Sequence, residues 1–140
     1  MADSKPLAEV ELNIPSRPEY VGVARLAILG VASRMRFSYD EVEDIRLAVG
    51  EACTRSIDRL NGGADSHAIN LRCLIDANRL TIEVRNALTK AAPAPAEADT
   101  PDAEKGLSDV LIRILMDEVD TEERPDEGIY LLRMVKYVAR

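Results

Sequence analysis

Apolar residues in the first sixty positions recur at intervals of three and four, the spacing of one face of an α-helix. From Glu19 to Met35 this spacing predicts a helix with one core-facing stripe: Val21, Ala24, Ile28, Val31 and Met35. A second helix is predicted to begin near residue 39, because Ser38 and Glu41 have the spacing of a capping box. It ends at Asn61-Gly62-Gly63, and its stripe is Val42, Ile45, Ala48, Val49, Ala52, Cys53, Ile57 and Leu60.

The period then changes to two, which is typical of β-strands. Apolar residues alternate with polar ones over 69–75 and again over 80–84, on either side of the turn Asp76-Ala77-Asn78, and this pattern predicts a β-hairpin. Continuing the register places Asn86 on the same face as Val84. A shorter alternation at 11–15 predicts a strand before the first helix.

The C-terminal part adds a loop, a helix and a final strand. Residues 90–105 are rich in Ala, Pro and acidic residues without periodicity, and they are predicted to form a mobile lid loop. A third helix fits Ser108–Met116, and 127–138 reads as the last strand. The order of elements predicts an α+β fold, a two-layer α/β sandwich with helices on one face of a mixed sheet. We expect one domain at 11–140 after a flexible tail at 1–10.

Composition narrows the function classes. The formal charge of -7 argues against nucleic acid and against an anionic membrane surface, since both need clustered Lys and Arg. The sequence has neither the apolar run of a membrane span nor that of a signal peptide, so we expect a cytoplasmic protein. Cys53 and Cys73 lack metal-ligand spacing and are interpreted as buried thiols. His67, the only histidine, is interpreted as an exposed polar residue, so no metal site is expected.

Two longer stretches carry a family resemblance. PEYVGVARLAILGVASRMRFSYDEVEDIRLAVGEACT (18–54) and GLSDVLIRILMDEVD (106–120) resemble the RsbW family of anti-sigma-B factors and serine-protein kinases, within the GHKL ATPase superfamily. The resemblance covers about residues 11–138 and implies a Bergerat-type sandwich. It also implies binding of a sigma factor, ATP-dependent phosphorylation of an anti-anti-sigma (STAS-domain) protein, and a homodimer.

The first nucleotide motif of this family is a helical Glu followed four residues later by Asn. The resemblance makes Glu51 the general base and places Arg55 where Asn would supply an oxygen to Mg²⁺. A guanidinium has five donors and no acceptor, so Arg55 cannot coordinate the metal. It could contact phosphate directly. The alternative is an intrahelical Glu51–Arg55 pair worth roughly 0.3–0.5 kcal/mol.

The second motif is Asp-x-Gly-x-Gly at the end of a strand, where the Asp accepts from the adenine amino group. Here Asn86 stands at the Asp position and Leu88 adds bulk near the missing glycines. Asn86 can accept through its carbonyl, but without the assistance of charge. Without the resemblance, Asn86 is the polar end of a strand.

The third motif is Gly-x-Gly at a helix start, where free N–H groups meet phosphate. Gly106 and Leu107 match it, but Ser108 replaces the second Gly and Asp109 follows. Ser108 is expected to be an N-cap, and Asp109 in the first turn would occupy the field of an anionic ligand. ATP and Mg²⁺, implied by the resemblance, are therefore expected to bind weakly or not at all.

Two functional hypotheses follow. In the first, the chain is an anti-sigma-type regulator that keeps its protein-binding surfaces, with Arg25 at the position where the family meets the sigma factor, while its ATP binding and kinase activity are weak or lost. Without the resemblance, Arg25 is a solvated helix residue. In the second, the chain is an active serine-protein kinase with a non-standard ATP site that uses Glu51, Arg55 and Asn86. The strand at 11–15 offers a sheet edge for the homodimer.

Overall fold

The structure, a computed structural model, describes residues 6–59, 67–88, 102–124 and 129–138. In chain order its elements are β1 (Ala8–Pro15), the short 3-10 helix η1 (Pro18–Tyr20), α1 (Val21–Ala32), α2 (Tyr39–Arg59), β2 (His67–Ile75), β3 (Arg79–Leu88), α3 (Asp102–Leu115), β4 (Glu118–Arg124) and β5 (Ile129–Tyr137). Among these residues no helix is both long and apolar enough to cross a membrane.

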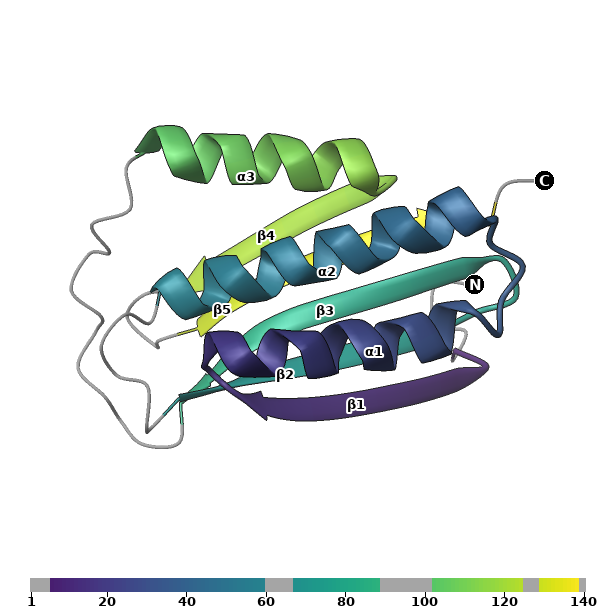
Figure 1. Cartoon of the computed structure of the whole chain (residues 1–140), viewed down its shortest axis with the longest axis horizontal. Helices are drawn as coiled ribbons and strands as arrows, with labels where there is room; N and C mark the ends of the chain where they lie inside the picture. The colour runs from purple at the N-terminus through teal and green to yellow at the C-terminus, as the bar shows by residue number, and fades with distance from the viewer. Residues whose placement is uncertain (1–5, 60–66, 89–101, 125–128, 139–140) are drawn as a thin grey trace.

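The elements form two layers, as the sequence predicted (Figure 1). Five strands make one sheet in the order β1-β2-β3-β5-β4, and α1, α2 and α3 lie side by side on one of its faces. The predicted mixed sheet is wrong in its strand directions, because all four neighbouring pairs are antiparallel. The α+β two-layer sandwich is confirmed. Helix α2 lies in the middle of the helical layer and contacts both α1 and α3.

The first two helices follow the predicted apolar stripes. Val21, Ala24, Ile28 and Val31 of α1 are buried, and Met35 packs against the core just beyond the helix. The capping box at the start of α2 is confirmed, because the Ser38 N–H donates to Glu41 Oε1 at 2.7 Å and the Glu41 N–H donates to Ser38 Oγ at 3.1 Å. The α2 stripe is buried at Ile45, Ala48, Val49, Ala52 and Cys53. The capping box therefore sets where α2 begins, and the apolar stripe sets which face of α2 packs on the sheet.

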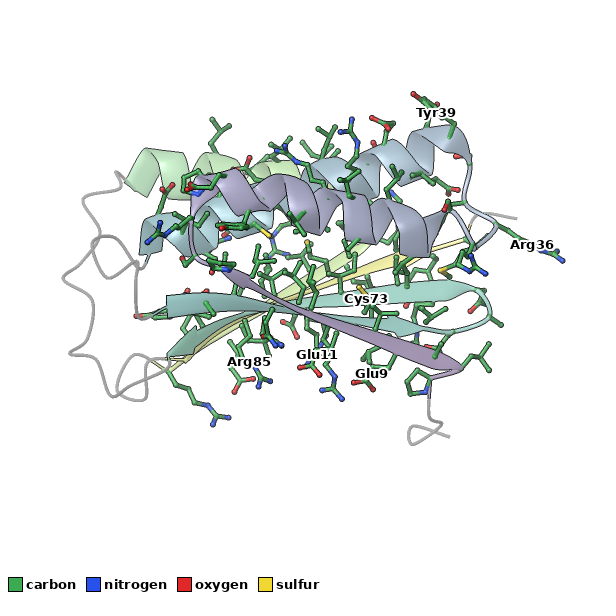
Figure 2. The ribbon with its side chains drawn as sticks, turned by 60° about the horizontal axis from the view of Figure 1, so that its bottom comes forward. Glu9, Glu11, Arg36, Tyr39, Cys73 and Arg85 are labelled. Carbon is green, nitrogen blue, oxygen red and sulfur yellow. The ribbon has the colours of Figure 1, made fainter. Side chains whose placement is uncertain are left out.

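The sheet separates an apolar face from a charged one. Ile69, Leu71 and Cys73 of β2 pair with residues of β3 in a register that puts their side chains under the helices. Glu9, Glu11 and Arg85 project from the opposite face (Figure 2). Burial raises the pKa of the Cys53 thiol to about 12 and that of the Cys73 thiol to about 11. Both cysteines are free and buried, as predicted.

Several boundaries differ from the sequence prediction. Strand β1 begins at Ala8, and the Leu7 N–H donates to the Ile75 carbonyl at 2.8 Å, so ordered pairing starts inside the segment expected to be a tail. Helix α3 begins at Asp102, six residues before the predicted start at Ser108. The predicted lid loop at 90–105 lies mostly outside the described residues, and its last residues belong to α3. The side chain of His67 also lies outside them.

The end of α3 is held by a buried lysine. Lys136 of β5 is 8% exposed, and its Nζ donates to the carbonyl of Leu115, the last residue of α3, at 2.6 Å. The same Nζ lies 3.6 Å from Asp44 Oδ2 on α2. A cation at a helix C-terminus satisfies a free carbonyl and interacts favourably with the helix dipole. Lys136 of β5 therefore links the sheet to both α2 and α3.

Candidate functional site

A small hollow, partly open to solvent, lies between the second half of α2 and the ends of three strands. Val84 and Asn86 of β3 form part of its wall together with side chains from α2, β4 and β5. Those side chains are Ala52, Arg55, Ser56, Thr121, Glu123, Tyr130, Leu131 and Leu132. The predicted residues Arg55 and Asn86 thus meet at one hollow, although 31 positions separate them in the sequence. Glu51 is half-buried on α2 and is not part of this wall.

Asn86 lies deep in the hollow. It is 5% exposed, and its Oδ1 accepts a hydrogen bond from the Ser56 hydroxyl of α2. Its Nδ2 is one of two buried side-chain atoms within the described residues that have no hydrogen-bond partner. An unpaired buried donor costs roughly 1–3 kcal/mol, so Nδ2 is a group that would gain from a ligand acceptor. The predicted register, with Asn86 on the face of Val84, is confirmed.

Arg55 pairs across helices, and the expected intrahelical pair with Glu51 is wrong. The Arg55 guanidinium donates to the Asp109 carboxylate of α3, and no ion pair joins Glu51 and Arg55 although both are described. The Arg55 side chain is 16% exposed. Because α3 starts earlier than predicted, Asp109 lies in the middle of the helix, where its carboxylate reaches α2. One guanidinium therefore occupies the position beside the hollow where the family resemblance places the metal ligand.

The third predicted motif lies inside α3. Only the first four N–H groups of an α-helix lack an intrahelical partner. Because α3 begins at Asp102, the N–H groups of Gly106, Leu107 and Ser108 fall beyond those four. Ser108 is not an N-cap, and its Oγ is the second buried atom without a partner among the described residues. Leu107 is 70% exposed and does not contribute to the wall of the hollow.

The chemistry of these groups does not fit Mg²⁺. Magnesium takes oxygen ligands, and a guanidinium paired with a carboxylate offers it no lone pair. At the base position Asn86 offers the adenine amino group, which is a donor, an uncharged amide oxygen that also accepts from Ser56, with a free donor beside it.

Arg25 lies between the first two helices. A Cβ at Gly50 of α2 would lie 2.5 Å from Arg25 Nε and 2.6 Å from its Nη2, so the guanidinium covers a residue that must lack a side chain. Arg25 is half-buried, and its charge also acts on the Cys53 thiol. Within the described residues its guanidinium has no hydrogen-bond acceptor or carboxylate partner. The solvated helix residue and the partner-binding residue therefore both stay possible interpretations of Arg25.

Comparison with known proteins identifies the family. The family described as Histidine kinase-like ATPase domain matches residues 14–136. Serine-protein kinase RsbW of Bacillus pumilus is 38% identical over 144 residues, covering 94% of this chain and 86% of that protein. Serine-protein kinase RsbW of Bacillus subtilis is 33% identical over 139 residues, covering 92% of this chain and 85% of that protein. The chain belongs to the RsbW family.

A solved structure agrees with the RsbW family fold. The crystal structure of the RsbU and RsbW domains of Rv1364c from Mycobacterium tuberculosis matches with a TM-score of 0.70 over 96% of this chain. This chain covers 34% of that longer chain, and the two are 9% identical in sequence. The match therefore shows the GHKL-type fold and nothing further.

Some residues that line the hollow were missed by the sequence prediction. Ser56 adjoins Arg55, but nothing in the α2 pattern indicates that its hydroxyl faces Asn86 of β3. Thr121 and Tyr130 reach the hollow because β4 and β5 pair beside β3, and strand order is not readable from periodicity. Asp109 was noted for its charge, and only the early start of α3 makes it the partner of Arg55.

Proposed function

We propose that this chain is an anti-sigma-factor-type regulator in a partner-switching pathway, whose ATP binding and kinase activity are weak or lost. It binds a sigma factor, an anti-anti-sigma (STAS-domain) protein, or both. Family membership supports the regulatory role, since relatives match over most of both chains. We place this regulator in the cytoplasm as a homodimer whose subunits meet at the edge strand β1.

The Arg55–Asp109 ion pair is the main support for weak or lost ATP binding and kinase activity. A guanidinium and a carboxylate that satisfy each other leave little attraction for a triphosphate or for a metal. The buried donor of Asn86 and the enclosed N–H groups of Gly106 to Ser108 support the same conclusion. All three positions that resemble nucleotide motifs therefore favour weak binding.

The protein-binding role has a candidate residue in Arg25. Its guanidinium is held over Gly50 without a carboxylate partner in the described part of the chain, so its donors remain available to a partner protein. Leu26 and Leu47, which are 70% and 50% exposed, lie on the same two helices as Arg25 and Gly50. A cation beside exposed apolar side chains is typical of a protein-binding surface.

Isothermal titration of the full chain against its cognate sigma factor and STAS-domain protein tests the regulatory role. Binding to at least one of them is expected, and it should weaken in Arg25→Ala. Absence of binding to both would exclude the proposal. Thermal unfolding with millimolar ATP, with and without Mg²⁺, tests whether ATP binding is weak or lost. A ligand that binds only the folded state raises the stability of the protein.

The second candidate is an active serine-protein kinase that phosphorylates a STAS-domain protein. The retained Glu51 and the kinase names of the relatives favour it. In this version Glu51 is the base, Arg55 contacts phosphate and Asn86 reads adenine. Transfer of labelled phosphate from ATP, abolished by Glu51→Gln, would support the kinase and overturn the claim of lost activity.

A further inference from the structure

Strand β1 carries different chemistry on the two faces of the sheet. Val10, Leu12 and Ile14 lie directly opposite buried residues of β2, so their side chains are on the face that the helices cover. Glu9 and Glu11 alternate with them and project from the other face, called the open face below (Figure 2). Val10 is 40% exposed and Leu12 is only partly buried. The edge of β1 therefore has apolar side chains on one side and carboxylates on the other.

The outer edge of β1 is open within the described residues. This strand is the first in the sheet order, and β2 is the strand that pairs with it there. An unpaired edge offers its N–H and C=O groups to another strand, which in the homodimer proposed above is β1 of a second copy. A two-fold axis normal to the sheet pairs the two strands antiparallel and keeps like faces together. Val10 and Leu12 of both copies then meet on the helix face, which favours this pairing.

The same symmetry brings carboxylates of the two copies together on the open face. In a pairing centred on residue 10, Glu11 lies directly opposite Glu9 of the second copy. In one centred on residue 11 the two Glu11 residues are directly opposite, and in one centred on residue 12 they are diagonal neighbours. Like charges at such positions destabilise a strand pair. Each of these registers therefore carries a repulsion that involves Glu11.

The cation beside Glu11 is already engaged. Arg72 of β2 lies opposite Glu11, but its Nε donates to Glu9 Oε2 at 2.7 Å and its Nη1 lies 3.9 Å from Glu83 Oε1. Glu11 Oε2 accepts from the neutral amide of Asn70 at 2.8 Å. One guanidinium thus faces the two carboxylates of β1. The open face keeps a net negative charge at this edge, in each copy of the chain.

We propose that the homodimer contact at β1 is sensitive to salt and strengthens as the ionic strength rises. Apolar contact through Val10 and Leu12 favours the contact, and repulsion between exposed carboxylates of the two copies opposes it. Salt screens such charges, since the Debye length falls from about 10 Å at 0.1 M to about 3 Å at 1 M. The inference rests on the homodimer of the proposed function and adds the condition that controls it.

Sedimentation velocity of the full chain at about 0.05 M and about 0.5 M NaCl tests this inference. The Kd of the wild-type dimer should fall about threefold or more at the higher salt concentration. Glu11→Gln keeps the shape of the side chain and removes its charge. It should lower the Kd about threefold or more at the lower salt concentration and remove most of the salt dependence.

Asp120→Asn is the matched control for charge. Asp120 is an exposed carboxylate on β4, the strand at the other edge of the same sheet, and the charge change is the same. This variant should keep the Kd within about twofold of the wild type and keep its salt dependence. Equal effects of Glu11→Gln and Asp120→Asn would reduce the salt dependence to the net charge of -7 and overturn the proposal. A larger effect of Asp120→Asn would place the contact at β4 and overturn it too.

Val10→Asp tests the apolar side of the same edge. It adds a carboxylate where the two copies meet and should raise the Kd about tenfold or more. Val110→Asp on α3, where the valine is 52% exposed, is its control and should leave the Kd within about twofold. Circular dichroism checks that both variants fold. Equal Kd values for the two valine variants would move the contact away from β1 and overturn the proposal.

Two further outcomes separate this inference from the proposed function. A chain that stays monomeric at both salt concentrations, with Glu11→Gln as well as without it, would contradict the homodimer and the salt-sensitive contact together. A dimer that Val10→Asp dissociates, but whose Kd neither salt nor Glu11→Gln changes, would keep the homodimer at β1 and overturn the salt sensitivity alone.

Discussion

The guanidinium of Arg55 on α2 forms an ion pair with the carboxylate of Asp109 on α3, across 54 positions of sequence. The Arg55 side chain is 16% exposed and that of Asp109 is 39% exposed. The pair fixes the polar side of α3 against α2, next to the hollow that contains Asn86. At position 55, where the family resemblance implies a metal ligand, the structure therefore has an ion pair whose two charges cancel.

Removal of the Asp109 carboxylate should destabilise the fold modestly. Asp109→Ala leaves Arg55 mostly buried and unpaired, and we expect a loss of about 1 kcal/mol in the free energy of unfolding, discounted for the exposure of Asp109. Urea unfolding measures it. Asp120→Ala, at an exposed carboxylate of β4, is the control and should change stability by less than about 0.5 kcal/mol. Equal losses would mean that the ion pair contributes nothing.

Restoration of family-like residues should restore nucleotide binding. Arg55→Asn and Asn86→Asp replace a guanidinium by an oxygen ligand and a free donor by a charged acceptor, and Asp109→Ala removes the carboxylate left without its partner. We expect Mg-ATP to raise the thermal midpoint of this triple variant and to leave the wild type nearly unchanged, with a gain of about 2.7 kcal/mol at about 100 times Kd. A wild-type shift as large as that of the variant would contradict the proposed loss of ATP binding.

Gly50→Ala should displace Arg25. A methyl group there would meet the guanidinium at 2.5–2.6 Å, whereas one at Gly22 of α1 has nothing within 4 Å. Gly22→Ala should therefore stabilise the fold by about 0.5–1 kcal/mol through helix propensity, and Gly50→Ala should gain less because Arg25 must move. Calorimetric titration should show that only Gly50→Ala weakens partner binding. Equal effects of the two variants on binding would exclude Arg25 as a positioned contact.

The buried thiols should make stability fall at high pH. Burial raises the pKa of Cys53 to about 12, above its ordinary value of 9.0, so the folded state keeps the proton while the unfolded state releases it. This contribution is complete below about pH 9 and is lost as the pH rises towards 12. Urea unfolding at about pH 8 and about pH 10 should show a smaller decline in Cys53→Ala, by up to ~1.4 kcal/mol per pH unit. Identical declines would contradict the raised pKa.

Local signals predicted much of the fold because they act over a few residues. The capping box at Ser38 and Glu41, the stripe of α2 and the alternation of β2 and β3 each depend on neighbours in sequence. The start of α3 was missed, because Gly106 and Ser108 look like a helix beginning while the backbone from Asp102 is already helical. Strand directions were missed because periodicity gives faces and not partners.

The sequence by itself determined the two layers, the buried cysteines and the departures at residues 55, 86 and 108 from the family's nucleotide motifs. Only the tertiary structure decided what those departures contact. Arg55 meets Asp109 rather than Glu51, Asn86 meets Ser56, and Arg25 lies over Gly50. The physical reason is that charge pairing and hydrogen bonding depend on distances of a few ångströms, which the packing of helices and strands sets between residues far apart in the chain.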